Sequence, residues 1–69
     1  MPENCINLID QIIEIRKQKG MTQSDLAKAA HLAQPAIARL ESKSAVPQLN
    51  TLLKVLDALD QRLELVPNK

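Results

Sequence analysis

Apolar residues recur near a 3.6-residue period in the first part of the chain. When residues 4–19 are wound as an α-helix, these residues gather on one face. Gly20 comes next, and glycine commonly ends helices because it adopts a left-handed conformation without steric cost. The pattern therefore predicts an amphipathic helix that stops before Gly20. Its apolar face consists of Ile6, Ile9, Ile12 and Ile13.

A capping signal marks the start of a second helix. The Thr22 side chain is suited to accept a hydrogen bond from a backbone N–H in the first turn. Asp25, three residues later, is placed to accept a bond from the Thr22 backbone N–H in return. This reciprocal arrangement, the capping box, predicts a helix over residues 23–30. Its expected core face consists of Leu26, Ala27 and Ala30.

A three-residue turn, residues 31–33, separates this helix from a third one. These three residues are too few to form anything but a turn. Pro35 suits the first turn of a helix, where its missing N–H is not needed. Because a residue before proline avoids the α region, Gln34 is expected to be the N-cap of a helix that runs to about Ser42. This helix should bury Ile37 and Leu40.

The last third of the chain combines a leucine-rich helix with a short alternating segment. Leucines at helical spacing predict a fourth helix over residues 49–60, after a loop around Pro47. Residues 62–66 alternate polar and apolar side chains, which is typical of a strand. A lone strand has no partner within this chain, so its simplest partner is the same strand of a second subunit across a two-fold axis. The leucines of the fourth helix are then core or dimer surface, and the expected dimer interface comprises Leu56, Leu59, Leu63 and Leu65.

Composition narrows the range of functions. The 69 residues form one expected domain, residues 1–69, and include no Phe, Tyr or Trp, which excludes a base-stacking platform. An aliphatic core of this size is marginal alone, and this also favours a homodimer. A single Cys and a single His provide neither a disulfide framework nor a metal site.

The same composition gives no indication of catalysis or of a membrane. One His and one Gly do not assemble a catalytic triad or a phosphate-binding loop, so neither an enzyme nor a cofactor is expected. The apolar runs are too short for a membrane span or a secretory segment. The expected location is the cytoplasm.

Basic charge gathers in the middle of the chain. The overall net charge is +1, but residues 16–43 carry +4, residues 1–15 carry −3, and residues 44–69 are neutral. A basic segment attracts the phosphate backbone of double-stranded DNA. The excess of positive charge is modest, so the affinity of each subunit for DNA should be limited.

The segment TQSDLAKAAHLAQPAIARLE has the helix, turn and helix spacing of a DNA-binding motif, with small residues where two helices must cross closely. With the strings IEIRKQKGMTQSDLA, IARLE and VPQLNTLLKVLDAL, it resembles the lambda-repressor/Cro-like (Xre) family over residues 8–60. The resemblance implies a mainly α, compact domain of four to five helices. The helix-turn-helix core would cover residues 22–42. Residues 49–66 would supply a dimerisation helix and a short strand that pairs across a homodimer.

The resemblance also implies roles for particular residues. In the family, the residue at Gln23 touches a phosphate and braces the residue at Gln34, which reads a base edge, typically adenine. Arg39 lies at a later groove-facing position, where arginine suits guanine. Arg16 and Glu41 fall on a family ion pair that acts as scaffolding. The DNA-binding residues expected on this basis are Gln23, Gln34, Pro35, Ala38, Arg39, Ser42 and Lys43.

Simpler interpretations and departures from the family pattern leave the operator sequence open. Gln34 can be a polar cap only, and Arg39 a solvated surface residue. Pro35 replaces a polar residue that often reads a base, and Ala33 replaces the usual Ser or Thr cap. His31 stands at a turn position that the family usually fills with Gly, so the resemblance implies a left-handed backbone there.

Two functions follow from the resemblance. The first is a sequence-specific repressor that binds an inverted repeat of double-stranded DNA as a homodimer. The second is an antitoxin, because the terminal RLELV segment resembles that of HipB-like antitoxins, which bind DNA and also hold a HipA-like kinase toxin. A kinase-like neighbouring gene would favour the second.

Overall fold

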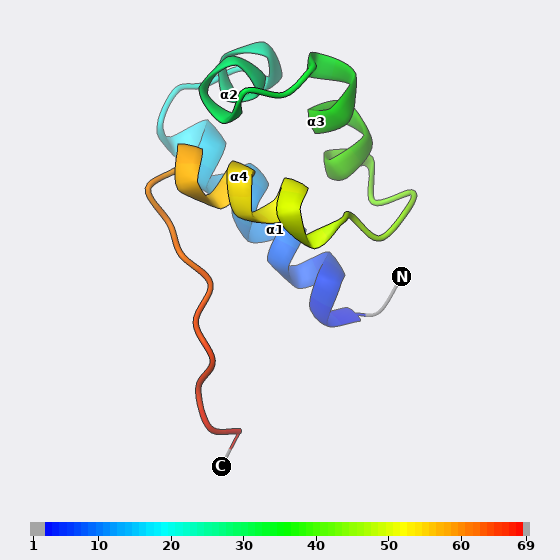
Figure 1. The fold of residues 1–69 in the computed structure, drawn as a ribbon, viewed down its shortest axis with the longest axis vertical. Coiled ribbons are helices and arrows are strands. Elements are labelled where there is room, and N and C mark those ends of the chain that lie inside the picture. The colour runs from blue at the N-terminus through cyan, green and yellow to red at the C-terminus, as the bar shows by residue number, and fades with distance from the viewer. Residues whose placement is uncertain (1–2, 69) are drawn as a thin grey trace.

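The computed structural model describes residues 3–68 as four helices and an extended C-terminal segment (Figure 1). The helices are α1 (Glu3–Gln18), α2 (Gln23–Ala30), α3 (Gln34–Ser42) and α4 (Leu49–Ala58). Helix α2 packs against both α3 and α4, and α1 packs against α3. The four predicted helices and the mainly α fold are thus confirmed, although α4 ends earlier than expected. The ends of the expected 1–69 domain lie outside the described residues.

Each of the four helices is followed, within two residues, by a left-handed residue. These are Gly20, His31, Lys43 and Asp60, with φ of 70°, 58°, 60° and 59°. After α2, the Leu32 N–H donates to the Ala27 carbonyl at 2.8 Å, and this bond closes the last turn. The left-handed conformation expected at His31 is confirmed, and it turns the chain from α2 towards α3.

The N-terminus of α2 carries the predicted capping box. The Asp25 N–H donates to the Thr22 hydroxyl oxygen at 3.0 Å, and the Thr22 N–H donates to the Asp25 carboxylate at 2.9 Å. The bond from the Thr22 backbone, helped by its hydroxyl and by the Lys28 charge, holds the pKa of Asp25 below its usual value. The start of α2 is therefore fixed locally, by residues adjacent in sequence.

The N-terminus of α3 differs from the prediction that Gln34 is the N-cap of this helix. The N-cap is Ala33, with φ −74° and ψ 146°, and it contributes no side-chain bond. Gln34 is instead the first residue of the helix, with Pro35 directly after it. The restriction before proline is a preference and not a prohibition. In this conformation the Gln34 side chain also donates to Gln23 of α2.

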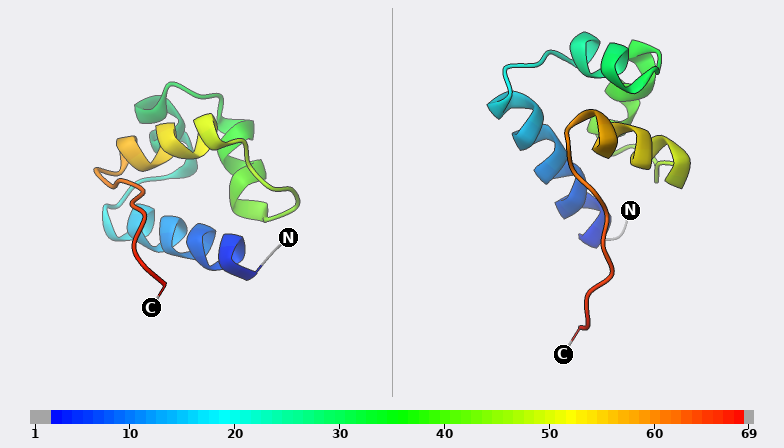
Figure 2. Two further views of the ribbon diagram at one scale, coloured as in Figure 1. Left: turned by 60° about the horizontal axis from the view of Figure 1, so that its bottom comes forward. Right: turned by 60° about the vertical axis from the view of Figure 1, so that its left-hand side comes forward.

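The core is entirely aliphatic and lies where the four helices meet (Figure 2). Leu56 and Leu59 belong to this core, with exposed fractions of 5% and 0%. Their side chains are covered by their own chain, so a direct dimer contact from these two residues stays a prediction that their burial does not favour. The other buried residues of the core cluster are Ile12, Leu26, Ala27, Ile37, Leu40, Leu52 and Val55.

After α4 the chain leaves the body in an extended conformation (Figure 1). Residues 61–68 contain no helix or strand, so the strand over residues 62–66 stays a prediction that requires a second chain. Leu63 is 47% exposed and packs near α1 around a small hollow, whereas Leu65 is 98% exposed. Within the described residues, no helix is long and apolar enough to cross a membrane.

Candidate nucleic-acid interface

One face of α3 is open to solvent and the opposite face is buried. Ile37 and Leu40 point into the core, with exposed fractions of 0% and 3%. Residues on the opposite side form one broad face, because positions four apart lie one above the other on a helix and two such rows stand side by side here. Ala38, in the middle of this face, is half-buried, and the others are exposed. The residues on this face are Gln34, Pro35, Ala38, Arg39 and Ser42.

Behind this face lies the predicted ion pair between Arg16 of α1 and Glu41 of α3. The Arg16 Nε donates to Glu41 Oε2 at 2.6 Å, and Nη2 donates to Oε1 at 2.9 Å. The Arg16 Nη1 also donates to the Met21 carbonyl at 2.7 Å. The two side chains are only 11% and 7% exposed. The pair is therefore a largely buried, two-pronged link between α1 and α3.

Two glutamines link the buried ion pair to the protein surface through side-chain hydrogen bonds. Gln23, at the start of α2, donates from Nε2 to Glu41 Oε1 at 3.0 Å. Its Oε1 accepts a hydrogen bond from Gln34 Nε2 at 2.9 Å. The brace expected between Gln23 and Gln34 is thus present. It connects the exposed Gln34 amide, through Gln23 and Glu41, to the Arg16 guanidinium.

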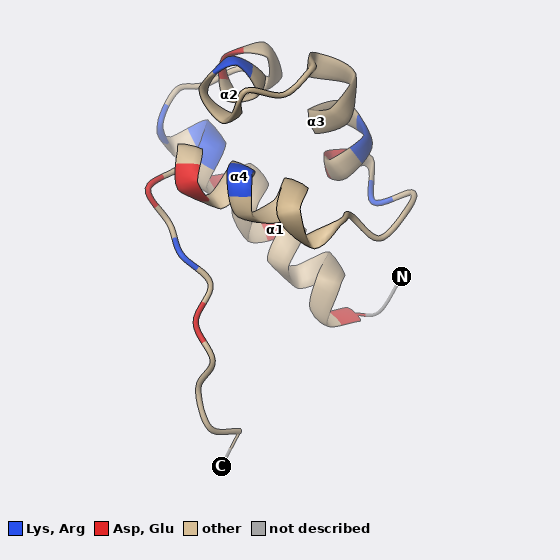
Figure 3. Cartoon of the chain, in the orientation of Figure 1, with Lys and Arg blue, Asp and Glu red and all other residues tan. Residues whose placement is uncertain are grey.

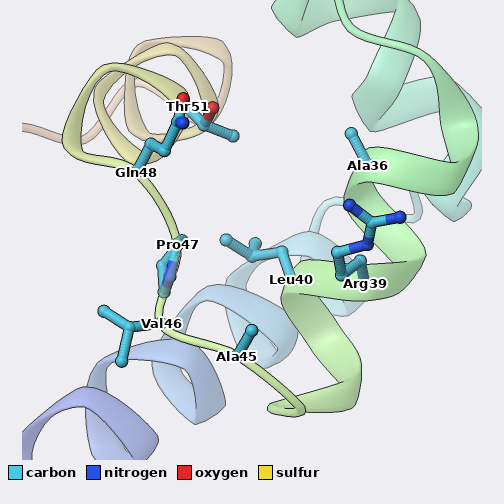
Figure 4. A pocket seen from close by; sticks show the side chains of 8 residues that line it. All are labelled: Ala36, Arg39, Leu40, Ala45, Val46, Pro47, Gln48 and Thr51. Atoms are coloured by element: carbon cyan, nitrogen blue, oxygen red, sulfur yellow. The ribbon is translucent and has the colours of Figure 1, made fainter.

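Arg39 lies further along the exposed face of α3. It is exposed and forms no ion pair within residues 3–68. Its side chain borders a hollow of about 350 Å³ between α3 and the start of α4 (Figure 4). Leu40, Val46 and Pro47 supply the apolar part of this hollow. The guanidinium thus lies at the rim of a surface depression between α3 and the start of α4.

Two of the residues expected to contact phosphates have other partners in the structure. The Lys43 ammonium forms an ion pair with Asp10 of α1. The Ser42 hydroxyl donates to the Arg39 carbonyl at 2.7 Å, and its oxygen lies 2.9 Å from the Ser44 hydroxyl, from which it can accept. Both interactions hold the C-terminal end of α3, where Lys43 is left-handed with φ of 60°. A phosphate contact from Lys43 would therefore compete with Asp10.

Charged residues are distributed over all four helices and the loop after α3 (Figure 3). Basic residues lie at the end of α1, on α2, on α3, in the loop after α3 and on α4, and each helix also carries at least one acidic residue. Several of these charges are neutralised, since Arg16, Lys19 and Lys43 pair with acidic residues. Lys28 and Arg39 form no such pair within the described part of the chain. In residues 3–68 no group of three His, Cys, Asp or Glu side chains is arranged to hold a metal ion.

Comparison with known proteins gives consistent matches. Residues 12–66 match the helix-turn-helix family. An uncharacterized HTH-type transcriptional regulator of Haemophilus influenzae is 42% identical over 62 residues, which are 90% of this chain and 63% of that protein. Antitoxin HigA1 of Mycobacterium tuberculosis is 36% identical over 64 residues, 93% of this chain and 43% of that protein. The chain thus spans less than two thirds of either relative.

Solved structures agree with these sequence matches. A chain of a toxin-antitoxin module from Streptococcus pneumoniae aligns with this protein with a TM-score of 0.81 and 37% identity. The alignment covers 97% of this protein and 74% of the Streptococcus pneumoniae chain. A chain in the structure of a HipA-HipB-O2-O3 complex aligns with a TM-score of 0.88 and 29% identity. The alignment covers all of this protein and 97% of the chain from that complex. The extent of the family match, together with the helix arrangement, decides the assignment: this chain belongs to the Xre-like helix-turn-helix family.

Proposed function

We propose that this chain is a sequence-specific regulator of transcription that binds double-stranded DNA as a homodimer and represses from an inverted-repeat operator. The observation that carries the proposal is the exposed face of α3. There, Gln34 is held by Gln23 from the preceding helix, and Arg39 stands without an ionic partner in the described structure. Membership of the helix-turn-helix family supports the same function.

The geometry of α3 fits base reading in the major groove. A single α-helix fits the width of that groove, and its first residues reach base edges. Gln34, the first residue of α3, offers an amide that matches adenine N6 and N7, and Arg39 offers a fork that matches guanine O6 and N7. Gln23, at the start of α2, lies close enough to Gln34 to contact the adjacent phosphate.

A homodimer would supply the two-fold symmetry that an inverted repeat requires. Leu65 and Val66 are 98% and 74% exposed, and they follow Leu63 in the extended segment after α4. Exposed apolar side chains that alternate with polar ones suit pairing with the same segment of a second chain. Two recognition helices would then lie in successive major grooves, about 34 Å apart. Repression would be steric, because a bound dimer covers contacts that polymerase needs.

Selection of duplexes from a random pool, at a stated salt concentration, tests this proposal. The expected result is an enriched inverted repeat that the wild-type protein binds more tightly than random duplex. Gln34→Ala should lose preference at one base pair in each half-site while the protein stays folded. Gln11→Ala, which removes the same side chain from an exposed site on α1, is the matched control and should bind as wild type does. Recovery of no enriched sequence by the folded wild-type protein would refute the proposal.

A second candidate function is that of an antitoxin that also binds a toxin. Two observations favour it: one relative is named an antitoxin, and the structural matches come from a toxin-antitoxin module and from a HipA-HipB complex. We infer that such a partner would be a HipA-like kinase encoded beside this chain, whose operon this chain would also repress. Co-expression with the adjacent gene product tests this. A stoichiometric complex supports the antitoxin role, and separate elution at micromolar concentration argues against it.

A further inference from the structure

We propose that Glu41 is a specificity-determining positioning residue, which fixes through Gln23 the edge of the Gln34 amide that faces DNA. The inference rests on the proposed function, because it assumes that Gln34 meets a base. It assigns to Glu41 a role beyond joining α1 to α3, although Glu41 itself touches no base.

The first step is the chemistry of the Glu41 carboxylate. It receives two hydrogen bonds from Arg16 and one from Gln23, at distances of 2.6, 2.9 and 3.0 Å. An ionised carboxylate has no hydrogen to donate and can only accept. Any side-chain amide that bonds to Glu41 must therefore turn its NH2 group towards it.

The second step passes this orientation to Gln23. Since its NH2 group is turned to Glu41, its carbonyl oxygen points the other way and can only accept. The Gln34 side chain meets that oxygen, with Nε2 at 2.9 Å. Gln34 must therefore also present its NH2 group inward. The orientation of both amides follows from the carboxylate and from the order of contacts, and each link in the series is a single hydrogen bond.

The third step is what remains free on Gln34, which is exposed. One N–H is used on Gln23, so one N–H and the carbonyl oxygen are left for a ligand. One donor and one acceptor match the N7 and N6 groups of adenine. The opposite orientation would use the carbonyl oxygen on Gln23 and leave two N–H donors, which match N7 and O6 of guanine. Glu41 would thus select adenine over guanine from a distance.

Exchanging the charges of the ion pair tests the inference. In a chain that carries both Arg16→Glu and Glu41→Lys, an ion pair can still form, but position 41 now only donates. Gln23 must then turn its carbonyl oxygen to it and its NH2 group to Gln34. The wild-type protein should prefer adenine at the base pair read by Gln34, by about 5-fold to 150-fold over guanine. The charge-exchanged protein should shift its preference towards guanine.

A matched control removes the orienting charge without reversing it. In a chain with Arg16→Met and Glu41→Met, apolar side chains of similar length replace the pair, a change that buried ion pairs often tolerate. This protein should lose most of its adenine preference and gain none for guanine. If the charge-exchanged chain does not fold, the chain with Arg16→Met and Glu41→Met tests the inference by itself. An adenine preference in that chain equal to that of the wild type overturns the inference.

A second measurement needs no DNA. In the free wild-type protein, nuclear Overhauser contacts of the Gln23 NH2 protons should reach the Glu41 side chain, and in the charge-exchanged protein they should reach Gln34. Adenine preference in all three proteins would overturn the role of Glu41 and leave the proposed function intact. Absence of any selected sequence for the wild type would refute the proposed function, and the inference with it. Wild-type contacts from these protons to Gln34 instead of Glu41 would refute the relay alone.

Discussion

Replacing Arg16 by methionine should destabilise the fold strongly. The change removes the two hydrogen bonds to Glu41 and the one to the Met21 carbonyl. It leaves the Glu41 carboxylate, whose side chain is 7% exposed, with only the Gln23 amide as a partner. Removing one partner of a buried ion pair costs about 3–5 kcal/mol. Because both side chains retain some exposure, we expect the lower end, about 3 kcal/mol.

That loss is large relative to the stability of a domain of this size. A chain of 69 residues is expected to have a free energy of unfolding of about 3–10 kcal/mol. A loss of about 3 kcal/mol corresponds to a fall in Tm of roughly 12–24 °C. Urea and thermal denaturation, followed by far-UV circular dichroism at one fixed protein concentration, measure it. The concentration must be fixed because dimerisation would change the apparent stability.

The double variant with Arg16→Met and Glu41→Met shows whether the loss of stability comes from the unpaired Glu41 charge or from the changed packing. With no charge left unpaired, its free energy of unfolding should lie within about 1 kcal/mol of wild type. The reasoning is refuted if the single Arg16→Met variant loses less than about 1 kcal/mol, which is the behaviour of an exposed ion pair.

Three other predictions concern DNA binding, assembly and acid stability. Arg39→Ala should weaken binding to the selected site by about 1–3 kcal/mol, measured by titration against the selected and a random duplex; equal losses on both would identify a backbone contact. Leu65→Lys should convert a dimer to a monomer in sedimentation, because it places a charge at the proposed seam; an unchanged dimer would exclude strand pairing there. The lowered pKa of Asp25 stabilises the fold above about pH 3.8, and this contribution is lost as the pH falls through the folded value. Asp25→Asn should therefore show a smaller loss of stability on acidification than wild type, and an equal loss in both would contradict the capping role.

The sequence alone determined the elements whose causes are local. The capping box of Thr22 and Asp25 involves residues only three apart in the chain. The left-handed backbone at His31 was expected from the family resemblance, and the structure has it, with φ of 58°. Helical periodicity placed the four helices because each apolar face has to be buried against the others. The spacing between Gln23 and Gln34, together with the family resemblance, also located the candidate DNA-reading face.

The tertiary structure decided what depends on residues that are distant in the chain. Periodicity marks Leu56 and Leu59 as apolar but does not say how deeply their own chain covers them; the folded structure does, since they are only 5% and 0% exposed. Local preference placed Gln34 before α3, but in the structure it is the first residue of that helix and its side chain bonds to Gln23 of α2. Likewise, only the meeting of α1, α2 and α3 brings Arg16 to Glu41 and orients the two glutamines, because hydrogen bonds across helices need positions in space that no local pattern specifies.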